Sequence, residues 1–358
     1  MPFRRKYLGR FDKEGCFTLF LRPHMSNLTT LVVGGAGYIG SHTVRLLASQ
    51  NRKVIVLDNL IYGHREALVD DSVELIEGSL NDRPLLDRIF SENQIDVVLH
   101  FAAFINVGES VNDPLKYYQN NTAAPVVLLQ AMQEHGCKAF VLSSTAAVYG
   151  EPVAIPIQES HPLQPVNPYG WSKLMLEQIL TDCDAAWGLK SVCLRYFNAS
   201  GSWGDGLIGE AHDPETHLIP NVLLAIQGKI DQMTVFGTDY DTPDGTCVRD
   251  YIHVMDLADA HAKALDHLKN GGASLRCNLG TGLGVSVREI LDAAKEVTGE
   301  EVPVKYGERR AGDPARLVAD PTKAKESLGW EAKHLEAKDM VESAWQWMTG
   351  SRGGKFDS

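Results

Sequence analysis

The chain has 358 residues, enough for one large α/β domain or two smaller units with their own cores. Hydrophobic residues make up 44% and charged residues 22% of it, which argues against wholesale disorder. Its formal net charge of -12 at pH 7 argues against nucleic acid or an anionic membrane surface as the main partner, and no apolar run approaches transmembrane length.

Cysteine and histidine spacing gives no indication of a metal centre. The six cysteines lie far apart without a CxxC pair, which predicts reduced, mostly buried thiols in a cytoplasmic protein. The twelve histidines are scattered too, and the sequence holds no HExxH or similar ligand spacing. We therefore predict no metal site.

Residues 1–24 differ in character from the rest of the chain. They carry a short apolar run at 16–21, too short for a signal-peptide core, among the basic residues Arg4, Arg5, Lys6, Arg10 and Arg22. From Met25 onward, MSNLTTLVVGGAGYIG is typical of the start of an enzyme. We expect residues 1–24 to be a dispensable, disordered N-terminal extension or the product of an upstream start codon, with a targeting role as the alternative.

The first half of the chain alternates short β-branched runs with longer amphipathic stretches. We expect strands at 31–33, 53–57, 73–76, 97–101, 139–142 and 191–195, and helices at 39–49, 83–91, 125–134 and 172–187. This alternation predicts a Rossmann-like α/β fold, a doubly wound parallel sheet with helices on both faces. Ligands of such sheets bind at the carboxyl ends of the strands, where the winding reverses.

After about Asn198 the pattern becomes less regular. Glycine, proline and aspartate gather at 201–216 and 237–245, which indicates long surface loops, before strand and helix patterns return at 247–252 and 255–268. We therefore predict a sheet domain at 25–198, a smaller, irregular C-terminal region at 199–349 that closes over it, and a disordered tail at 350–358.

A glycine-rich turn follows the first expected strand of the sheet and leads into a helix. Gly34 and Gly37 would let the backbone turn tightly and approach a pyrophosphate, and Gly40 would let the helix pack closely on its strand. The helix N-terminus adds backbone amides and a favourable dipole for phosphates. This setting predicts that residues 25–198 bind a dinucleotide.

The end of the next expected strand indicates which dinucleotide is bound. Asp58 is placed there to accept hydrogen bonds from a ribose diol, and its charge would repel a 2′-phosphate. NAD is therefore expected, while the nearby His64 and Arg65 leave NADP as the alternative.

Tyr169 is the only tyrosine of the chain with a lysine four residues on, Lys173. On a helix this spacing places both side chains on one face, where the ammonium would lower the pKa of the phenol and make it a usable general base. Upstream, Ser143, Ser144 and Thr145 end an expected strand and offer hydroxyls to a substrate oxygen. An exposed tyrosine–lysine pair is the alternative, but the combination of these groups after a dinucleotide turn is specific.

With these motifs the chain resembles the extended short-chain dehydrogenases/reductases, and among them the UDP-glucose (UDP-galactose) 4-epimerases. The resemblance covers residues 30–347 and is most specific in VRDYIHVMDLADAH. It rests on GGAGYIGSHT (34–43), HFAAFINVGES (100–110), YYQNN (117–121), SSTAAVYGEP (143–152), NPYGWSKLMLEQIL (167–180), LRYFNASG (194–201), HLIPNVL (217–223), DGTCVRDYIHVMDLADAH (244–261) and RRAGDPARLVAD (309–320).

The resemblance implies an isomerase that interconverts UDP-galactose and UDP-glucose. Tyr169 would take the proton of the sugar 4-hydroxyl while C4 passes its hydride to the nicotinamide, and Lys173 would hold the phenolate and the nicotinamide ribose. The 4-keto sugar would turn over and accept the hydride on its other face, so NAD is not consumed and is expected to co-purify. A homodimer through the helices at 125–134 and 172–187 is also implied, although their apolar faces suit a core equally well.

Carried over by position, the resemblance implies three sets of site residues. The catalytic residues would be Thr145, where the family often has serine, Tyr169 and Lys173. NAD would be bound by Gly34, Gly37, Tyr38, Ile39, Gly40, Asp58, Asn59, Ser79, Leu80, Phe101, Ala102, Ala103, Asn120, Tyr169, Lys173 and Phe197. The UDP-sugar would be bound by Thr145, Tyr169, Asn198, His217, Leu218, Val235, Phe236, Arg249, Arg310, Asp313 and Leu317.

Some of these positions carry their own physical argument. Arg249 and Arg310 suit bidentate phosphate binding, with a surface salt bridge as the alternative for each. Ser79 replaces a common aspartate that reads the adenine amine, which predicts altered adenine contacts. Ile105 replaces a lysine found in some members, and Leu317, of intermediate size, leaves turnover of an N-acetylhexosamine open.

Other functions remain as alternatives. Nucleotide-sugar 4,6-dehydratases and UDP-glucuronate decarboxylases need an acidic residue near the threonine, whereas Ala146 and Ala147 follow Thr145 here. Epimerases of a UDP-pentose, UDP-uronate or UDP-N-acetylhexosamine are harder to exclude. A non-catalytic NAD-sensing regulator on the same fold is the alternative outside the enzymes, but such proteins commonly lose the tyrosine or lysine that this chain keeps.

Overall fold

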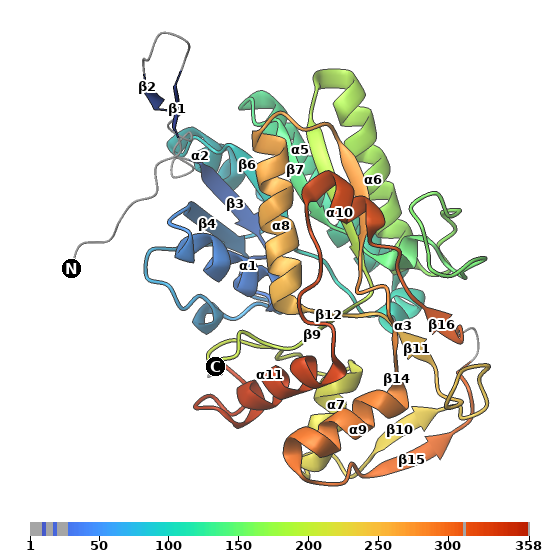
Figure 1. The fold of residues 1–358 in the computed structure, drawn as a ribbon. Helices are drawn as coiled ribbons and strands as arrows, with labels where there is room; N and C mark the ends of the chain where they lie inside the picture. Colours follow the sequence, from blue (N-terminus) through green and yellow to red (C-terminus); the bar gives the residue numbers. More distant parts are fainter. Residues whose placement is uncertain (1–8, 12–16, 20–27, 311–312, 357–358) are drawn as a thin grey trace.

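The computed structural model describes residues 9–11, 17–19, 28–310 and 313–356. A seven-stranded sheet runs through the upper part of the molecule in Figure 1, and every neighbouring pair in it is parallel. The strand order is β13-β8-β7-β6-β3-β4-β5. The strands are β3 (Thr29–Val33), β4 (Lys53–Asp58), β5 (Glu74–Glu77), β6 (Val97–His100), β7 (Ala139–Ser143), β8 (Lys190–Tyr196) and β13 (Leu275–Leu279).

Both faces of this sheet are covered by helices, so its strands are apolar on both sides. In β3, Leu31 and Val33 face one core and Val32 faces the other, and all three are almost fully buried. The first core includes α2 (Arg83–Glu92), α5 (Ala124–Glu134) and α6 (Pro168–Trp187). The second includes α1 (Tyr38–Ser49), α8 (Val254–Lys269) and α10 (Thr322–Leu328).

The winding of the sheet reverses at β3, because β4 and β5 follow on one side of it and β6 and β7 on the other. A doubly wound sheet has its ligand crevice at such a point, outside the carboxyl ends of the strands. Short elements follow β6 on this side: α3 (Val107–Asn112), α4 (Pro114–Tyr118) and one π-helical turn, η3 (Gln119–Ala123).

A second group of elements lies below the carboxyl edge of the sheet in Figure 1. Its core contains α7 (Leu218–Ile226), α9 (Val287–Thr298) and α11 (Ala337–Thr349). Three small sheets accompany them: β10 (Met233–Phe236) with β15 (Val304–Gly307), β9 (Asn198–Ser200) with β12 (Tyr251–His253), and β14 (Val285–Ser286), β11 (Val248–Arg249) and β16 (Arg316–Leu317).

The predicted Rossmann-like α/β fold is confirmed, and each strand and helix expected before residue 198 overlaps an observed element. The chain also returns to the large sheet after residue 198, because α8 covers one face and β13 pairs with β8 at the edge. The sequence patterns did not indicate β13.

The two ends of the chain differ from each other. The extension at 1–24 lies mostly outside the described residues, apart from the antiparallel strands β1 (Gly9–Phe11) and β2 (Phe17–Leu19). At the other end, residues 350–356 of the expected disordered tail belong to the described part of the chain. Phe356 is buried there, with its ring 4.9 Å from that of Trp347 and 4.8 Å from that of His64, so one aromatic side chain anchors the segment.

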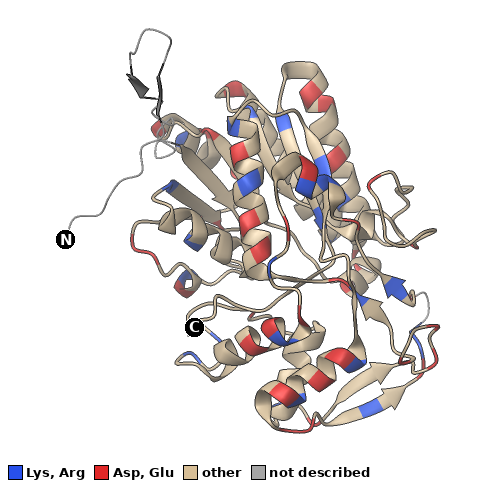
Figure 2. Cartoon of the chain, viewed as in Figure 1, with Lys and Arg blue, Asp and Glu red and all other residues tan. Residues whose placement is uncertain are grey.

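Charged residues of both signs are interspersed along the helices seen in Figure 2. In the described part of the chain, no helix combines the length and apolar character that crossing a membrane requires.

Candidate active site

The glycine-rich turn lies between β3 and α1, at the carboxyl edge of the sheet. Gly34 has a φ of +77°, and a Cβ on it would lie 2.5 Å from the amide nitrogen of Ala102. A Cβ on Gly40 would lie 2.2 Å from the carbonyl oxygen of Gly34. Packing within the protein therefore requires glycine at both positions.

Gly37 has no such internal requirement. A Cβ on it would meet one atom within 4 Å, the Gly34 carbonyl oxygen at 3.5 Å, which is an ordinary contact. Gly37 is also the residue before α1, whose first amides are free to bind an anion. The turn therefore fits the close approach of a dinucleotide pyrophosphate at this position.

Asp58 ends β4 and is held beside the turn. Its Oδ2 accepts a hydrogen bond from the Ala36 amide and its Oδ1 accepts one from the Leu60 amide, both at 2.9 Å. Burial raises the pKa of this carboxyl, while the backbone hydrogen bonds act in the opposite direction. Since each carboxylate oxygen has a second lone pair, the group can still accept from a ribose diol.

The two residues that left NADP open have partners elsewhere. His64 stacks on Phe356, and its Nε2 lies 3.3 Å from the Ala211 carbonyl oxygen. Arg65 forms an ion pair with Glu77 at 2.6 Å. The geometry of the turn and Asp58 therefore favours NAD.

The remaining positions expected to contact NAD follow the carboxyl ends of neighbouring strands. Ser79 is half-buried after β5 and accepts the Asn81 amide on its Oγ at 3.2 Å, while Ile105 exposes 43% of its surface. The rest of the set lies directly after β4, β5, β6 and β8 and in the turn η3. Tyr38 and Ile39 are the first two residues of α1. The set comprises Asn59, Leu80, Phe101, Ala102, Ala103, Asn120 and Phe197.

The π-helical turn η3 places Asn120. The next residue, Asn121, is buried and bonds both backbone groups of Phe104 at 2.9 Å and the Ser172 hydroxyl at 3.2 Å. Thr122 also donates to the Ser172 carbonyl oxygen at 3.0 Å. These hydrogen bonds tie the π-helical turn η3 to α6. Single π-helical turns are frequent at functional sites.

The first turn of α6 carries Tyr169. Asn167 caps the helix by accepting the Gly170 amide at 2.9 Å, and Pro168 is its first residue. The Thr145 hydroxyl lies close enough to the Tyr169 phenol to act on its pKa. The structure therefore brings these two predicted catalytic groups together.

The neighbouring hydroxyls have other partners. Ser143 Oγ bonds the Tyr196 phenol, and Ser144 Oγ donates to Glu177 at 2.6 Å. Of the three hydroxyls that end β7, only Thr145 is directed at Tyr169. The spacing alone did not separate these hydroxyls, whereas the resemblance implied Thr145, the one that the structure places near Tyr169.

Lys173 lies one turn further along α6 and is almost fully buried. Its Nζ donates to the Ser143 carbonyl oxygen at 2.9 Å. Burial lowers the pKa of Lys173 to about 8, and the charge of Glu177 acts in the opposite direction. Lys173 is therefore held in place by the end of the strand that also carries Thr145.

The expectation that Lys173 lowers the pKa of Tyr169 is wrong. Burial raises the pKa of Tyr169, and only the nearby Thr145 hydroxyl acts to lower it. Desolvation of the phenolate outweighs a lysine whose ammonium is directed at a backbone carbonyl.

A cavity of about 400 Å³ lies next to this edge of the sheet. Most of the residues expected to bind the sugar nucleotide line it. These are Asn198, His217, Leu218, Val235, Phe236, Arg249, Arg310 and Asp313. Asn198 follows Tyr196 by two residues, and Tyr196 bonds Ser143, so the cavity begins close to Tyr169.

Both cavity arginines are held by other side chains. Arg249 forms an ion pair with Asp313 and donates to the Val248 carbonyl oxygen at 2.7 Å. The Arg310 guanidinium lies 4.0 Å from the centre of the Phe236 ring. Two positioned guanidinium groups in one cavity suit a diphosphate.

Leu317 does not line this cavity. It lies opposite Arg249 in the β11–β16 pair and packs, with Phe197, against the cluster that contains Ala146. It is therefore next to the turn that carries Thr145, on the sugar side of the predicted site.

Two features near the site were not found from sequence. Asp250 is buried and accepts hydrogen bonds from the Thr281, Gly282 and Ala319 amides at 2.8, 3.2 and 3.1 Å. A second group, Glu210, His212, Glu215 and His217, converges beside the cavity. In the sequence this group is visible as two glutamates and two histidines within eight residues, a spacing that a search for HExxH does not detect.

Known proteins share both the sequence and the fold. Residues 30–280 match the model of the NAD dependent epimerase/dehydratase family. A UDP-glucose 4-epimerase of Halalkalibacterium halodurans is 53% identical over 320 residues, 89% of this chain and 95% of that protein. A UDP-glucose 4-epimerase of Lacticaseibacillus casei is 50% identical over 89% of this chain and 96% of its own length.

Solved structures agree. The crystal structure of UDP-glucose 4-epimerase from Brucella ovis in complex with NAD has a TM-score of 0.87 and 47% identity, and the match covers 89% of this chain and 97% of that one. The enzyme from Bifidobacterium longum in complex with NAD⁺ and UDP has a TM-score of 0.85 and 41% identity, over 91% and 100%. This chain therefore belongs to the NAD dependent epimerase/dehydratase family, and within it to the UDP-glucose 4-epimerases.

Proposed function

We propose that the chain interconverts UDP-galactose and UDP-glucose, with Tyr169 as the acid–base residue and NAD as a retained cofactor. The observation that carries this proposal is the meeting of Tyr169, Thr145 and Lys173 beside the glycine turn and the cavity. The family contains this activity, as the names of the similar proteins state.

Each residue has a separate task in this proposal. Tyr169 removes the proton of the sugar 4-hydroxyl and returns it, and the Thr145 hydroxyl positions that oxygen beside the phenol. Lys173 supplies a buried positive charge on the same helix face, which favours the phenolate when substrate and cofactor exclude water. Bound NAD supplies a hydride acceptor that returns what it takes, so the reaction needs no added oxidant.

The residues after Thr145 support epimerisation over elimination. Ala146 and Ala147 begin a 3-10 turn directly after it and carry no proton-transfer group. A dehydratase or decarboxylase needs an acid or base at this point. Thr145 itself lies near Tyr169, and its Oγ1 accepts a hydrogen bond from the Ala147 amide at 3.1 Å.

The test is conversion of UDP-galactose followed by NMR, without added NAD, in wild type and Tyr169→Phe. Loss of the general base should lower kcat by about 100- to 10,000-fold. Tyr306→Phe, at an exposed tyrosine, is the matched control and should be unaffected. Equal conversion by wild type and Tyr169→Phe would exclude the proposed role. Parallel assays with UDP-N-acetylgalactosamine, UDP-glucuronate and UDP-arabinose define the sugar range.

We also propose a homodimer. Exposed apolar side chains gather on α3, α4 and the start of α6, which pack together. They are Val111, Leu115, Trp171 and Met175, with exposed fractions from 41% to 75%. Light scattering of Leu115→Glu should show a shift toward monomer if this face is the interface, and an unchanged mass would place the interface elsewhere.

A cytoplasmic location is proposed on the state of the thiols. The described cysteines are all free, which suits a reducing compartment.

A further inference from the structure

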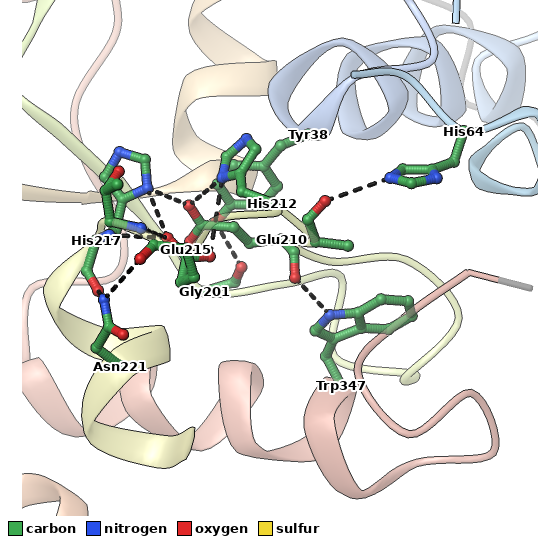
Figure 3. Close-up of polar contacts among 11 residues, drawn as sticks. Tyr38, His64, Gly201, Glu210, His212, Glu215, His217, Asn221 and Trp347 are labelled. Atoms are coloured by element: carbon green, nitrogen blue, oxygen red, sulfur yellow. Dashed lines mark hydrogen bonds and ion pairs between the residues drawn. The ribbon is translucent and has the colours of Figure 1, made fainter. Parts of the chain in front are cut away.

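Four side chains from one loop converge on a single point between the glycine turn and the cavity (Figure 3). One ligand atom from each of Glu210, His212, Glu215 and His217 lies within 4.8 Å of the others. Both histidines direct Nδ1 at the carboxylates. The site therefore presents two imidazole nitrogens and two carboxylates, which is a donor set for a transition metal rather than for Ca²⁺ or Mg²⁺.

The separations between the donor atoms suit four-fold coordination. Glu210 Oε1 lies 3.0 Å from Nδ1 of His212 and 2.7 Å from Nδ1 of His217. Glu215 Oε2 lies 3.8 Å from Nδ1 of His212, and Glu215 Oε1 lies 3.2 Å from Nδ1 of His217. A tetrahedron with metal–ligand bonds of about 2.0–2.1 Å has edges of about 3.3 Å, which falls inside this range.

The charges of the cluster also point to a cation. The Glu210 and Glu215 side chains are only 6% and 9% exposed. Within the described residues, their ion pairs are with the two histidines and with no lysine or arginine. Two buried carboxylates with neutral imidazoles would be balanced by one divalent ion, and buried charges are otherwise costly.

The loop that carries the four residues is anchored on several sides. Trp347 Nε1 of α11 donates to the Glu210 carbonyl oxygen at 2.8 Å, and the Asn221 side chain of α7 donates to the His217 carbonyl oxygen at 2.8 Å. Glu215 Oε1 accepts the Thr216 and His217 amides at 2.7 and 2.8 Å. Such support around the donor groups is what a metal site needs to hold its geometry.

We propose that Glu210, His212, Glu215 and His217 bind one divalent transition-metal ion of the zinc class. Its role would be structural. The ion would tie residues 210–217 into one body at the start of α7, whose residues line the cavity. On the opposite side, Tyr38 of the glycine turn contacts the His212 ring edge-on and donates to the Gly201 carbonyl oxygen at 2.6 Å. The ion would therefore stabilise the junction between the two ligand sites.

The competing description is a metal-free network of hydrogen bonds. In that network Nδ1 of His212 bonds Glu210, and Nδ1 of His217 lies within bonding distance of both Glu210 and Glu215. A ring nitrogen that donates a proton in this way cannot bind a metal at the same time. Metal binding must then release protons and become tighter as pH rises, which the metal-free network does not predict.

The experiment uses the full chain with any affinity tag removed. Bound metal is stripped with a chelator, the chelator is dialysed away, and Zn²⁺ or Co²⁺ is titrated at neutral pH. Stoichiometry comes from elemental analysis after equilibrium dialysis, and coordination from the visible absorption of Co²⁺. We expect one equivalent per chain, a tetrahedral Co²⁺ spectrum, proton release, and a higher Tm with Zn²⁺.

Two variants test the ligands. His212→Ala and Glu210→Gln should weaken Zn²⁺ binding by at least about 100-fold, since loss of an outer partner alone costs ten- to a hundredfold. His135→Ala removes a histidine from an ordinary histidine–carboxylate pair with Asp87 and should bind like wild type. Circular dichroism establishes that each variant is folded, and Glu210→Gln keeps the side-chain shape if His212→Ala does not fold.

Wild type that binds no stoichiometric Zn²⁺ or Co²⁺, or folded ligand variants that bind as wild type does, would overturn the proposal. Activity is not the readout, so either result leaves the epimerase assignment to its own test.

Discussion

A Cβ placed on Gly170 would lie 2.7 Å from the carbonyl oxygen of Ala147, so the first turn of α6 rests directly on the turn that follows Thr145. This close approach holds Tyr169, the residue before Gly170, near Thr145. A backbone contact thus sets the distance between two predicted catalytic groups.

Gly170→Ala should therefore push α6 away from this turn. Misplacement of a reacting group by about 1 Å can cost about 100-fold, so we expect kcat to fall by about 10- to 100-fold with a smaller change in KM. The measurement is steady-state conversion of UDP-galactose. Gly108→Ala is the control, because a Cβ there would have only an ordinary 3.5 Å contact. Unchanged kcat in a folded Gly170→Ala protein would contradict the argument.

The two glycines Gly37 and Gly40 should respond differently to the same substitution. Gly37→Ala leaves the protein's own packing intact, so its Tm should match wild type while its content of co-purified NAD falls at least about tenfold. Gly40→Ala meets the Gly34 carbonyl oxygen at 2.2 Å and should lower the Tm. Thermal unfolding and the NAD released on denaturation measure both effects. Full NAD content in Gly37→Ala would show that no phosphate approaches this residue.

Below pH 8, the buried charge of Lys173 should lower the free energy of unfolding. Its folded pKa of about 8, set mainly by burial, is below the ordinary value of 10.5. At 1.36 kcal/mol per pKa unit, this difference corresponds to a desolvation cost of about 3 kcal/mol. A substitution of Lys173 would remove that cost, but it would also remove the hydrogen bond to the Ser143 carbonyl oxygen, which is worth about 1 kcal/mol. Lys173→Met should thus raise the free energy of unfolding by about 2 kcal/mol at pH 7 while it abolishes turnover.

The sign of the pH dependence follows from the two pKa values. Below pH 8 the lysine is charged in both states, and the folded state bears the full desolvation cost. Between pH 8 and 10.5 the unfolded chain binds the additional proton, so the stability of wild type rises and the advantage of Lys173→Met disappears. Urea unfolding of NAD-stripped protein at pH 7 and pH 10 measures this, with the exposed Lys190→Met as control. An advantage that is equal at both pH values would exclude the ionisation as its cause.

Asp250 should be a positioning residue for the sugar-nucleotide site. Its carboxylate bonds the 281–282 turn and Ala319, and its backbone bonds the Leu317 carbonyl oxygen at 2.9 Å and the Asn198 amide at 3.3 Å. Asp250→Asn would set an amide NH₂ against backbone donors and should cost about 2–4 kcal/mol of stability.

UDP binding by Asp250→Asn, measured by calorimetry, should weaken as well, because Arg249 and Leu317 both flank the displaced backbone. Asp239→Asn removes an exposed carboxylate and serves as the control. A variant with wild-type stability would show that the buried carboxylate is not needed to hold these segments.

Much of the fold follows from patterns that extend over a few residues. Gly34, Gly37 and Gly40 between an apolar strand and an amphipathic helix suffice to predict the turn, because backbone freedom is a local property. The strands before residue 198 could be identified for the same reason, since most of them are apolar runs covered on both faces, and the edge strand β5 keeps Leu75 and Ile76 between two exposed glutamates. Tyr169 and Lys173 share a helix face through their spacing alone.

The features that were missed depend on segments distant in sequence. β13 is a strand because it pairs with β8, more than seventy residues earlier, and its Arg276 and Asn278 obscure the apolar pattern. Phe356 is buried because His64 and Trp347 form its surroundings.

The sequence by itself therefore determined the turn, the alternation of strands and helices, and the shared helix face of Tyr169 and Lys173, and its resemblance to a known family implied Thr145 beside them. Only the tertiary structure decided which way the pKa of Tyr169 moves, and that Glu210, His212, Glu215 and His217 meet at one point. Burial, desolvation and convergence arise when separate segments exclude water together, and no single segment of the sequence contains them.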